Sequence, residues 1–250
     1  MFEIFIVSIV SFTAAILTFF SGFGLGTILT PVMMIFFPTE VAIAFTGLVH
    51  FSNNIFKFFL VGKNIDKKVL IRFGLPSIIA ALIGAYLLIL IDSDIVIFSY
   101  YFFDKKIDVI LVKFLISILL IIFAIIDLIP QVNNLHFDKK YLPLGGFLSG
   151  FFGGLSGNQG ALRSAFLVKH GLEKSVFVAT TVAISSLVDI TRLSVYSTNF
   201  LNLNYSDFYQ LGFFSVFSAV TGSFIGNKLL KKVTIEQIKK IVALLLILLG

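Results

Sequence analysis

The chain has 250 residues, of which 58% are hydrophobic and 13% are charged, and its mean hydropathy is +1.05. Soluble domains carry about 25% charged residues, so this composition excludes an ordinary soluble enzyme and predicts a membrane protein. The net charge of +6 does not indicate nucleic-acid binding, because most of the positive charge lies in short loops between apolar segments, as in membrane proteins. There is no cysteine, which excludes disulfides and thiolate catalysis.

The first part of the chain predicts a broken helical hairpin followed by membrane spans. Met1 is followed by no basic region and no small-residue cleavage pattern, so the first apolar segment is interpreted as a membrane segment and not as a signal peptide. In the predicted hairpin, 12–37, glycines at 22, 24 and 26 interrupt an apolar stretch that ends at Pro31. A membrane span needs about 20 apolar residues. Runs of this kind follow at 41–61, 69–91 and 107–129.

The second half repeats this pattern. After a linker at 130–140, glycines from Gly150 to Gly160 interrupt an apolar stretch in the predicted hairpin 142–171. This stretch must begin and end on the same side of the membrane if the next span is to leave again. We therefore expect two half-length helices there, either as a re-entrant hairpin or as two very short spans. The spans that follow are predicted at 176–196, 208–230 and 235–250.

The charges in the loops predict the topology. Loops 63–72 and 228–240 are rich in lysine, so the positive-inside rule places them in the cytoplasm together with the linker. Loop 197–207 has no lysine or arginine, and 92–108 has four aspartates against two lysines, so both are expected outside. The two halves then enter the membrane from opposite sides, and both termini face outward.

These features predict an all-α polytopic membrane protein made of two inverted-topology repeats, 1–129 and 141–250. Each repeat would be a glycine-broken hairpin followed by three spans. Irregular backbone survives in lipid only where protein or a water-filled cavity satisfies it, and paired breaks at matching places indicate a transporter's binding site near the midplane. The alternative is a plain bundle whose glycines only allow close helix packing.

A stripe of polar side chains follows each predicted hairpin. The first stripe is Thr46, His50, Asn53 and Lys57, whose spacing of i, i+4, i+7 and i+11 keeps them on one helical face. The second, about 135 positions later, is Thr181, Ser185, Asp189 and Arg192. A charge at the centre of a membrane helix costs about 2.5–3.5 kcal/mol, so such residues normally face a cavity or a partner. We expect the two stripes to line one cavity.

Arg163 is the strongest candidate for binding an anion. It lies in the first turn of the second half-helix, where free backbone N–H groups and the helix dipole favour negative charge. Its planar guanidinium matches oxyanions such as sulfonate or carboxylate. Asn158, Gln159 and Gly160 lie beside it at the predicted break. The alternative is that Arg163 neutralises Asp189 as a structural ion pair.

Lys57 and Arg192 are expected to line the approach from the two sides of the membrane. Either could instead extend to the interface, and Arg192 is spaced for a local salt bridge with Asp189. His50 lies near the middle of its span and titrates in the physiological range, so His50 or Asp189 is a candidate carrier of a coupling proton. A structural hydrogen bond is the alternative for His50. No metal or cofactor is expected, since the three histidines lack zinc spacing.

These motifs resemble those of the sulfite exporter TauE/SafE family of membrane transporters. The glycines at 22, 24 and 26, with Pro31, fit the first copy of a glycine-rich segment that the family carries in each half. The stretch from Gly150 to Gly160 fits the second copy, although Ala165 stands where the proline would fall. The resemblance extends over nearly the whole chain. It implies a transporter, usually an exporter, of small and often sulfur-containing anions.

We therefore predict a secondary transporter that exports sulfite or an organosulfonate by alternating access, in the inner membrane of a bacterial cell. The candidate substrate-binding residues are Arg163, Asn158, Gln159, Gly160, Gly24, Gly26, Thr27, Asn53, Lys57 and Arg192. An anion channel and a permease for carboxylates or other small anions are the alternatives. An intramembrane enzyme is not expected, because no catalytic carboxylate pair and no nucleophile–base pair occur in the spans. The sequence does not indicate an oligomeric state.

Overall fold

A computed structural model describes residues 1–19, 24–91, 95–128, 138–167, 172–200 and 205–229, together with positions 240, 241, 244 and 247. Most of the predicted last span, 235–250, most of the linker 130–140 and the end of the second hairpin, 168–171, lie outside these residues. The helices are α1 Phe2–Thr18, α2 Leu25–Phe36, α3 Thr39–Val61, α4 Lys67–Leu90, α5 Leu111–Leu128, α7 Leu142–Ser156, α8 Gly160–Leu167, α9 Lys174–Phe200 and α10 Tyr205–Leu229, with short 3-10 turns at Gly62–Asn64 and Lys139–Tyr141.

Three of the described helices are long and apolar enough to cross a membrane: Lys67–Leu90, Ser175–Ser197 and Phe208–Lys228. Shorter apolar helices occur at Phe2–Thr18, Leu25–Phe36 and Leu111–Ile125. α3 has 23 residues, but the polar side chains of its stripe lower its hydropathy. The chain is therefore a mostly helical protein with apolar helices of membrane length.

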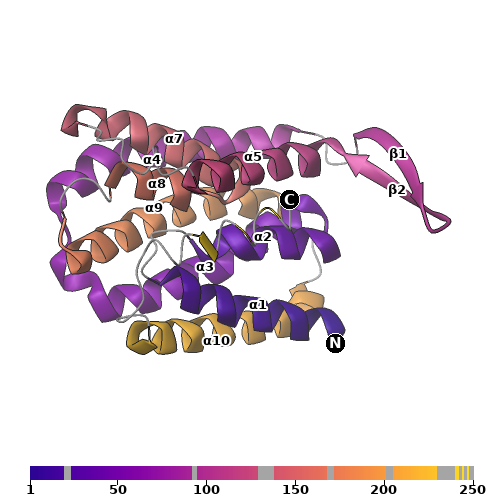
Figure 1. Cartoon of the computed structure of the whole chain (residues 1–250), viewed down its shortest axis with the longest axis horizontal. Coiled ribbons are helices and arrows are strands. Elements are labelled where there is room, and N and C mark those ends of the chain that lie inside the picture. Colours follow the sequence, from indigo (N-terminus) through magenta and orange to yellow (C-terminus); the bar gives the residue numbers. More distant parts are fainter. Residues whose placement is uncertain are drawn as a thin grey trace.

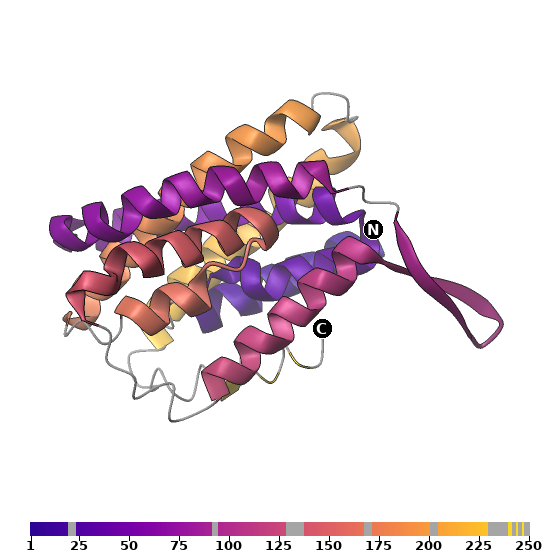
Figure 2. The same cartoon turned by 90° about the horizontal axis from the view of Figure 1, so that it is seen from above.

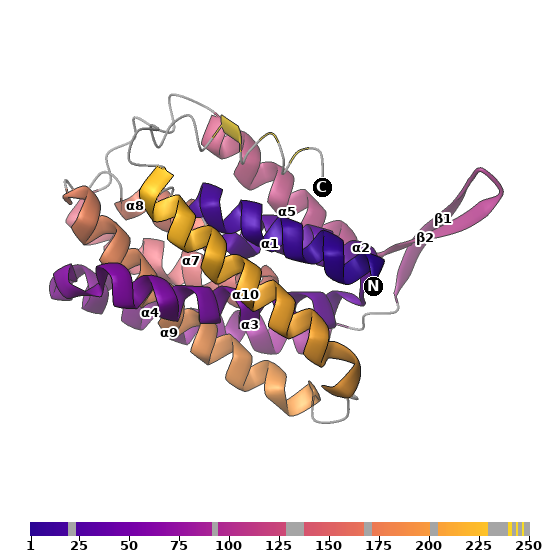
Figure 3. The same ribbon diagram turned by 90° about the horizontal axis from the view of Figure 1, so that it is seen from below.

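The helices run roughly side by side in three layers (Figure 1). α4 and α7 form one layer, α3 and α9 lie in the middle, and α1 and α10 form the third. In each of these pairs, one helix comes from the first half of the chain and the other from the second. The view from below shows α1 lying along α10 (Figure 3). Each of these helices thus packs mainly against a helix of the opposite half.

Glycines allow α4 and α7 to approach closely. A Cβ atom at Gly146, Gly150 or Gly154 would lie 2.1–2.2 Å from a backbone carbonyl oxygen of α4, namely that of Phe73, Ser77 or Ala81. The Ser77 hydroxyl donates hydrogen bonds to the carbonyl oxygens of Phe73 (2.8 Å) and Gly146 (2.9 Å). Small residues at such contacts are the usual means of bringing membrane helices together. Gly150 and Gly154, which we interpreted as part of the second break, lie within α7 and serve this packing.

The second break itself is confined to 157–159. α7 ends at Ser156, and Gly157 caps it in the left-handed conformation with φ of 79°, which glycine adopts without steric cost. Its N–H donates to the carbonyl oxygen of Gly153 at 3.0 Å. α8 then begins at Gly160. In the first half, α1 ends at Thr18 and α2 begins at Leu25, so a helix ends near the expected glycines there too; residues 20–23, including the glycine at 22, lie outside the described residues.

A β-hairpin that we did not predict lies between α4 and α5. Strand β1 (Val96–Phe102) pairs with strand β2 (Lys105–Ile110) in antiparallel register, and the hairpin projects from one end of the helices (Figures 1 and 2). Phe103 and Asp104 turn the chain with φ of 46° and 59°, as in two-residue hairpin turns. The all-α class therefore applies to the bundle but not to this loop. Residues 107–110 of the predicted span 107–129 belong to β2, and the helix starts at Leu111.

The β-hairpin and the turn after α3 offer a direct test of topology. The lysine bias predicts that Tyr101→Cys, on the hairpin, faces outside and that Lys68→Cys, at the start of α4, faces the cytoplasm. Both residues are exposed, and the chain has no other cysteine. An impermeant thiol reagent should therefore label Tyr101→Cys in intact cells and Lys68→Cys only after permeabilisation. Labelling of Lys68→Cys in intact cells would contradict the predicted orientation.

Candidate functional site

The two helix breaks, one from each half, lie against each other. A Cβ atom at Gly26, in the first turn of α2, would lie 3.5 Å from the carbonyl oxygen of Gly157. A Cβ atom at Gly157 would lie 2.9 Å from Nη1 of Arg192 and 3.3 Å from the hydroxyl of Thr30. A Cβ atom at Gly24 would lie 2.6 Å from Nε2 of His50. The glycines thus let side chains of α2, α3 and α9 approach the broken backbone.

Asp189 is the charged centre of this region. Its carboxylate is fully buried and accepts from Nε of Arg192 at 3.0 Å, with Nη2 of Arg192 at 2.8 Å. Its other oxygen lies 2.6 Å from Nδ1 of His50 and accepts from the Asn54 amide at 3.2 Å. The Gln159 amide donates to Asp189 at 3.2 Å. A buried carboxylate is stable only with such partners, and here they come from α3, α9 and the second break.

Arg163 is joined to this centre through Gln159. Its Nη1 donates to the Gln159 side-chain oxygen at 3.0 Å, while the Gln159 amide nitrogen donates to Asp189. The direct ion pairs of Asp189 are with Arg192 and His50. The local Asp189–Arg192 pair that the spacing allowed is present, and Arg163 is linked to Asp189 through Gln159.

Lys57 lies farther along α3, beyond His50. Its side chain is buried, and its Nζ sits over the ring of Phe19 at 5.2 Å from the ring centroid. Asn53, one turn before Lys57, is buried and accepts a hydrogen bond from the Ser223 hydroxyl of α10 at 2.7 Å. Both Lys57 and Arg192 are buried within the protein.

Several buried polar atoms around the breaks have no hydrogen-bond partner in the described part of the chain. They are the hydroxyls of Thr27, Thr30 and Thr46, both side-chain polar atoms of Asn158, and Nη1 of Arg192. Other threonines of the bundle bond a carbonyl one turn back, as Thr18 does to Ala14 at 2.7 Å. A buried polar group without a partner is costly. This set therefore marks a place that suits a polar ligand.

The structure brings most of the predicted site residues together. Those at the breaks or on Asp189 are Gly24, Gly26, Thr27, His50, Asn158, Gln159, Asp189 and Arg192. Gly160 starts α8, Arg163 is one hydrogen bond farther away, and Asn53 and Lys57 lie beyond on α3. We missed Thr30 as a candidate, although its spacing of three residues from Thr27 places both on one helical face.

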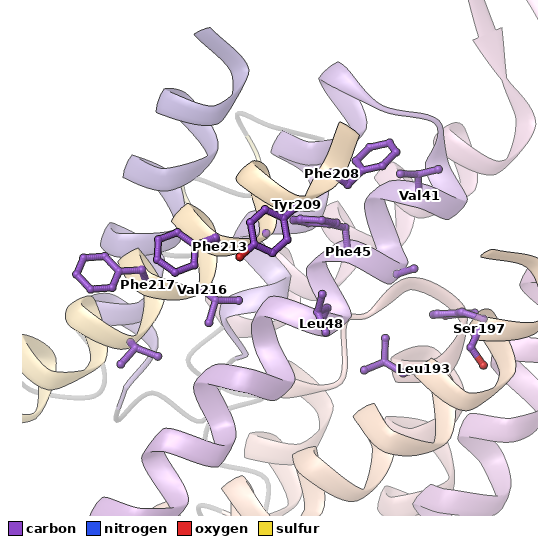
Figure 4. Close-up of a pocket in the computed structure, with 14 residues that line it drawn as sticks. Val41, Phe45, Leu48, Leu193, Ser197, Phe208, Tyr209, Phe213, Val216 and Phe217 are labelled. Atoms are coloured by element: carbon purple, nitrogen blue, oxygen red, sulfur yellow. The ribbon is translucent and has the colours of Figure 1, made fainter. Parts of the chain in front are cut away.

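A large groove lies elsewhere, between α3, α9 and α10 (Figure 4). It has a volume of about 810 Å³ and is lined mainly by apolar and aromatic side chains, among them Phe45, Leu48, Phe213 and Phe217. Tyr196 lines it and also donates from its hydroxyl to the carbonyl oxygen of Gly154. An apolar lining does not suit an anion, so we place the site at the helix breaks and not in this groove.

Apolar helices of membrane length and a buried cluster of charges at two helix breaks define an integral membrane protein of the transporter class. The family model described as "Sulfite exporter TauE/SafE" matches residues 7–250. The chain therefore belongs to the TauE/SafE sulfite exporter family, a family of membrane transporters, as the sequence motifs indicated. No match to a curated protein was found.

Proposed function

We propose that this protein exports a small anion, sulfite or an organosulfonate, across the inner membrane of a bacterial cell as a secondary transporter. The observation that carries the proposal is the contact between the two helix breaks beside Arg192. The backbone of Gly157, the first turn of α2 and the Arg192 guanidinium meet there, and unsatisfied buried donors surround them. Membership of an exporter family supports the substrate class.

In this proposal the anion binds between Arg192, Asn158 and the hydroxyls of Thr27, Thr30 and Thr46. Nη1 of Arg192 and the Asn158 amide supply donors, and the hydroxyls can donate to anionic oxygens. The guanidinium is held by Asp189 on its other side, so its direction is fixed before an anion arrives. A preorganised donor set binds more tightly than one that must be ordered on binding.

The His50–Asp189 pair is the proposed carrier of a coupling proton. Nδ1 of His50 lies 2.6 Å from Asp189, and Nε2 of the same ring faces Gly24 at the first break. A proton on His50 would add positive charge beside the proposed anion site. Protonation and anion binding would then favour each other, as coupled transport requires. A purely structural His50–Asp189 hydrogen bond is the alternative.

The packing of the helices supports alternating access between two inverted repeats. α1 pairs with α10, α4 with α7, and α3 with α9. If the halves are repeats, equivalent helices make equivalent contacts. The first helix of each half, α1 or α7, packs against the second long span of the other half, α10 or α4. Such an arrangement is what a two-fold axis in the membrane plane would produce. Each break would then move with helices of both halves.

Counterflow in liposomes tests this function and separates a carrier from a channel. Purified protein in liposomes loaded with unlabelled sulfite should take up external ³⁵S-sulfite transiently above equilibrium, because a carrier exchanges one anion for another. A channel would equilibrate the label without this overshoot. Methanesulfonate, sulfate and acetate as internal anions would rank the substrates and test the carboxylate alternative. Absence of exchange with all four anions, relative to protein-free liposomes, would rule the proposal out.

A further inference from the structure

The β-hairpin between α4 and α5 has one face that is apolar. Residues that pair across two antiparallel strands lie on the same side of the sheet, and successive residues of a strand lie on opposite sides. The apolar side consists of two such pairs, Phe98 with Val109 and Tyr100 with Ile107. The ring centroids of Phe98 and Tyr100 are 6.5 Å apart. We call this surface the aromatic face of the hairpin.

The opposite face of the hairpin is polar and charged. It carries the pairs Ser99 with Asp108 and Tyr101 with Lys106. The Ser99 hydroxyl donates to the Asp108 carboxylate at 2.5 Å, and the Lys106 ammonium lies 2.9 Å from the same oxygen. Ionised groups are costly to remove from water. This face is therefore suited to contact with water.

The aromatic face is exposed in the described part of the chain. The exposed fraction is 52% for Phe98 and 46% for Tyr100. A contiguous group of exposed apolar side chains rimmed by polar residues usually marks an interaction with another protein or with a membrane. The hairpin thus calls for an apolar partner on one side and water on the other.

The hairpin is attached to apolar helices of the bundle. It lies between the end of α4 and the start of α5 (Figure 2), and β2 continues into α5 with no residue between them. The Leu111 N–H donates to the carbonyl oxygen of Ile95 at 2.8 Å, which ties the base of the hairpin to α5. Phe114 and Ile118 of α5 are exposed, as expected of a helix that faces lipid. Along the chain, a lipid-facing surface therefore passes directly into the aromatic face.

The chemistry of this face favours the membrane surface as its partner. Tyrosine is enriched where the bilayer meets water, because its ring is apolar and its hydroxyl is polar. Amphipathic elements on a membrane bury their apolar face about 5–10 Å deep, at the boundary of headgroups and acyl chains. β1 has seven residues and so extends about 23 Å. The aromatic face can therefore contact this boundary along its whole length only if the hairpin lies along the membrane surface.

We propose that the β-hairpin lies on the membrane surface, with the aromatic face against lipid and the Asp108–Lys106 face toward water. The bilayer is present wherever α4 and α5 cross it, so this partner needs no second protein. The proposal goes beyond the transport function, because it assigns an interaction surface outside the helices and does not depend on the substrate. By the predicted topology the hairpin lies on the outer surface, where it would hold the ends of α4 and α5 at a fixed depth.

Two adjacent tyrosines provide a matched pair of reporters. The chain has no tryptophan, so Tyr100→Trp on the aromatic face and Tyr101→Trp on the polar face each introduce a single indole. The probe is phosphatidylcholine brominated near the headgroup end of its acyl chains. In liposomes of this lipid, Tyr100→Trp should lose most of the fluorescence that it has in unbrominated liposomes, whereas Tyr101→Trp should keep most of it. Acrylamide in the aqueous phase should quench the two variants in the opposite order.

Three outcomes of this measurement would overturn the proposal. Equal quenching of the two variants by the brominated lipid would mean that the hairpin does not present one face to the membrane. Quenching of both by acrylamide and of neither by lipid would mean that the hairpin stands in water. Protection of Tyr100→Trp from both quenchers would mean that protein covers the aromatic face. Recovery of acrylamide quenching when the protein is diluted in lipid would then identify a second copy as the cover.

A charge placed on the aromatic face tests whether its apolar character causes the contact. Ile107→Asp, directly opposite position 100, is added to Tyr100→Trp. A carboxylate is costly in lipid, so quenching by the brominated lipid should fall and quenching by acrylamide should rise. The control is Tyr101→Asp in the same background, which adds the charge on the polar face opposite Lys106 and should leave lipid quenching unchanged. Lipid quenching that persists after Ile107→Asp would count against the proposed contact.

Discussion

Gly150→Ala is expected to lower the free energy of unfolding by about 3 kcal/mol, near the upper end of the usual cost of overpacking. A Cβ atom at this position would lie 2.1 Å from the carbonyl oxygen of Ser77 and 2.5 Å from its Cα. Backbone of a packed helix cannot rotate away as a side chain can, so α7 must separate from α4. The measurement is the midpoint of thermal or denaturant unfolding in detergent micelles.

Gly74 of α4 provides the matched control for this prediction. A Cβ atom at Gly74 would meet only side-chain carbons, the nearest at 3.6 Å, which is ordinary van der Waals contact. Because alanine favours a helix over glycine by about 1 kcal/mol, Gly74→Ala should be neutral or slightly stabilising. Similar unfolding midpoints for Gly150→Ala and Gly74→Ala would show that close approach of α4 and α7 does not need Gly150.

Much of the site could be predicted from periodicity. The spacing of Thr46, His50 and Asn53 placed them on one face of α3, and the matching stripe on α9 placed Asp189 and Arg192 opposite. The structure confirms that His50 and Asp189 meet. The prediction succeeded because a charged side chain in an apolar helix is stable only when it faces a cavity or a polar partner. Each stripe could therefore be expected to face the other.

Which arginine pairs with Asp189 could not be predicted from the sequence, because it depends on the tertiary structure. Both Arg163 and Arg192 could reach a carboxylate by sequence reasoning, but the choice depends on how α8 is rotated against α9. In the fold, Gln159 lies between Arg163 and Asp189. A sequence pattern reports the face of one helix and not the rotation of the next, so this question stayed open until the helices were placed.

Two other features had sequence signals that were missed. Gly146, Gly150 and Gly154 are spaced at four-residue intervals, which places them on one helical face and indicates close packing; we interpreted the last two as a break. The stretch 96–102 is rich in aromatic and β-branched residues, which favour strands. We interpreted it only as part of the external loop 92–108 between two predicted spans.

Asp189→Ala is expected to be the most damaging change at the site, lowering the free energy of unfolding by about 3–5 kcal/mol. It removes the acceptor for Arg192, His50, Asn54 and Gln159 at once. Arg192 is fully buried and would be left without its counter-charge. Sulfite binding at the breaks and counterflow should both disappear, because Arg192 loses the contact that orients it. Unfolding midpoints with and without sulfite measure both effects.

Double variants test which arginine forms the stabilising ion pair with Asp189. Combining Asp189→Ala with Arg192→Met should recover most of the lost stability, since both members of the ion pair are then gone and an apolar chain fills the space. Sulfite binding at the breaks should stay absent, because Arg192 is the proposed ligand. Combining Asp189→Ala with Arg163→Met should recover less, because Arg192 forms an ion pair with Asp189, whereas Arg163 is hydrogen-bonded to Gln159. If stability is recovered with Arg163→Met but not with Arg192→Met, Arg163 is the counter-charge of Asp189. Arg192 would then not be assigned as the anion ligand.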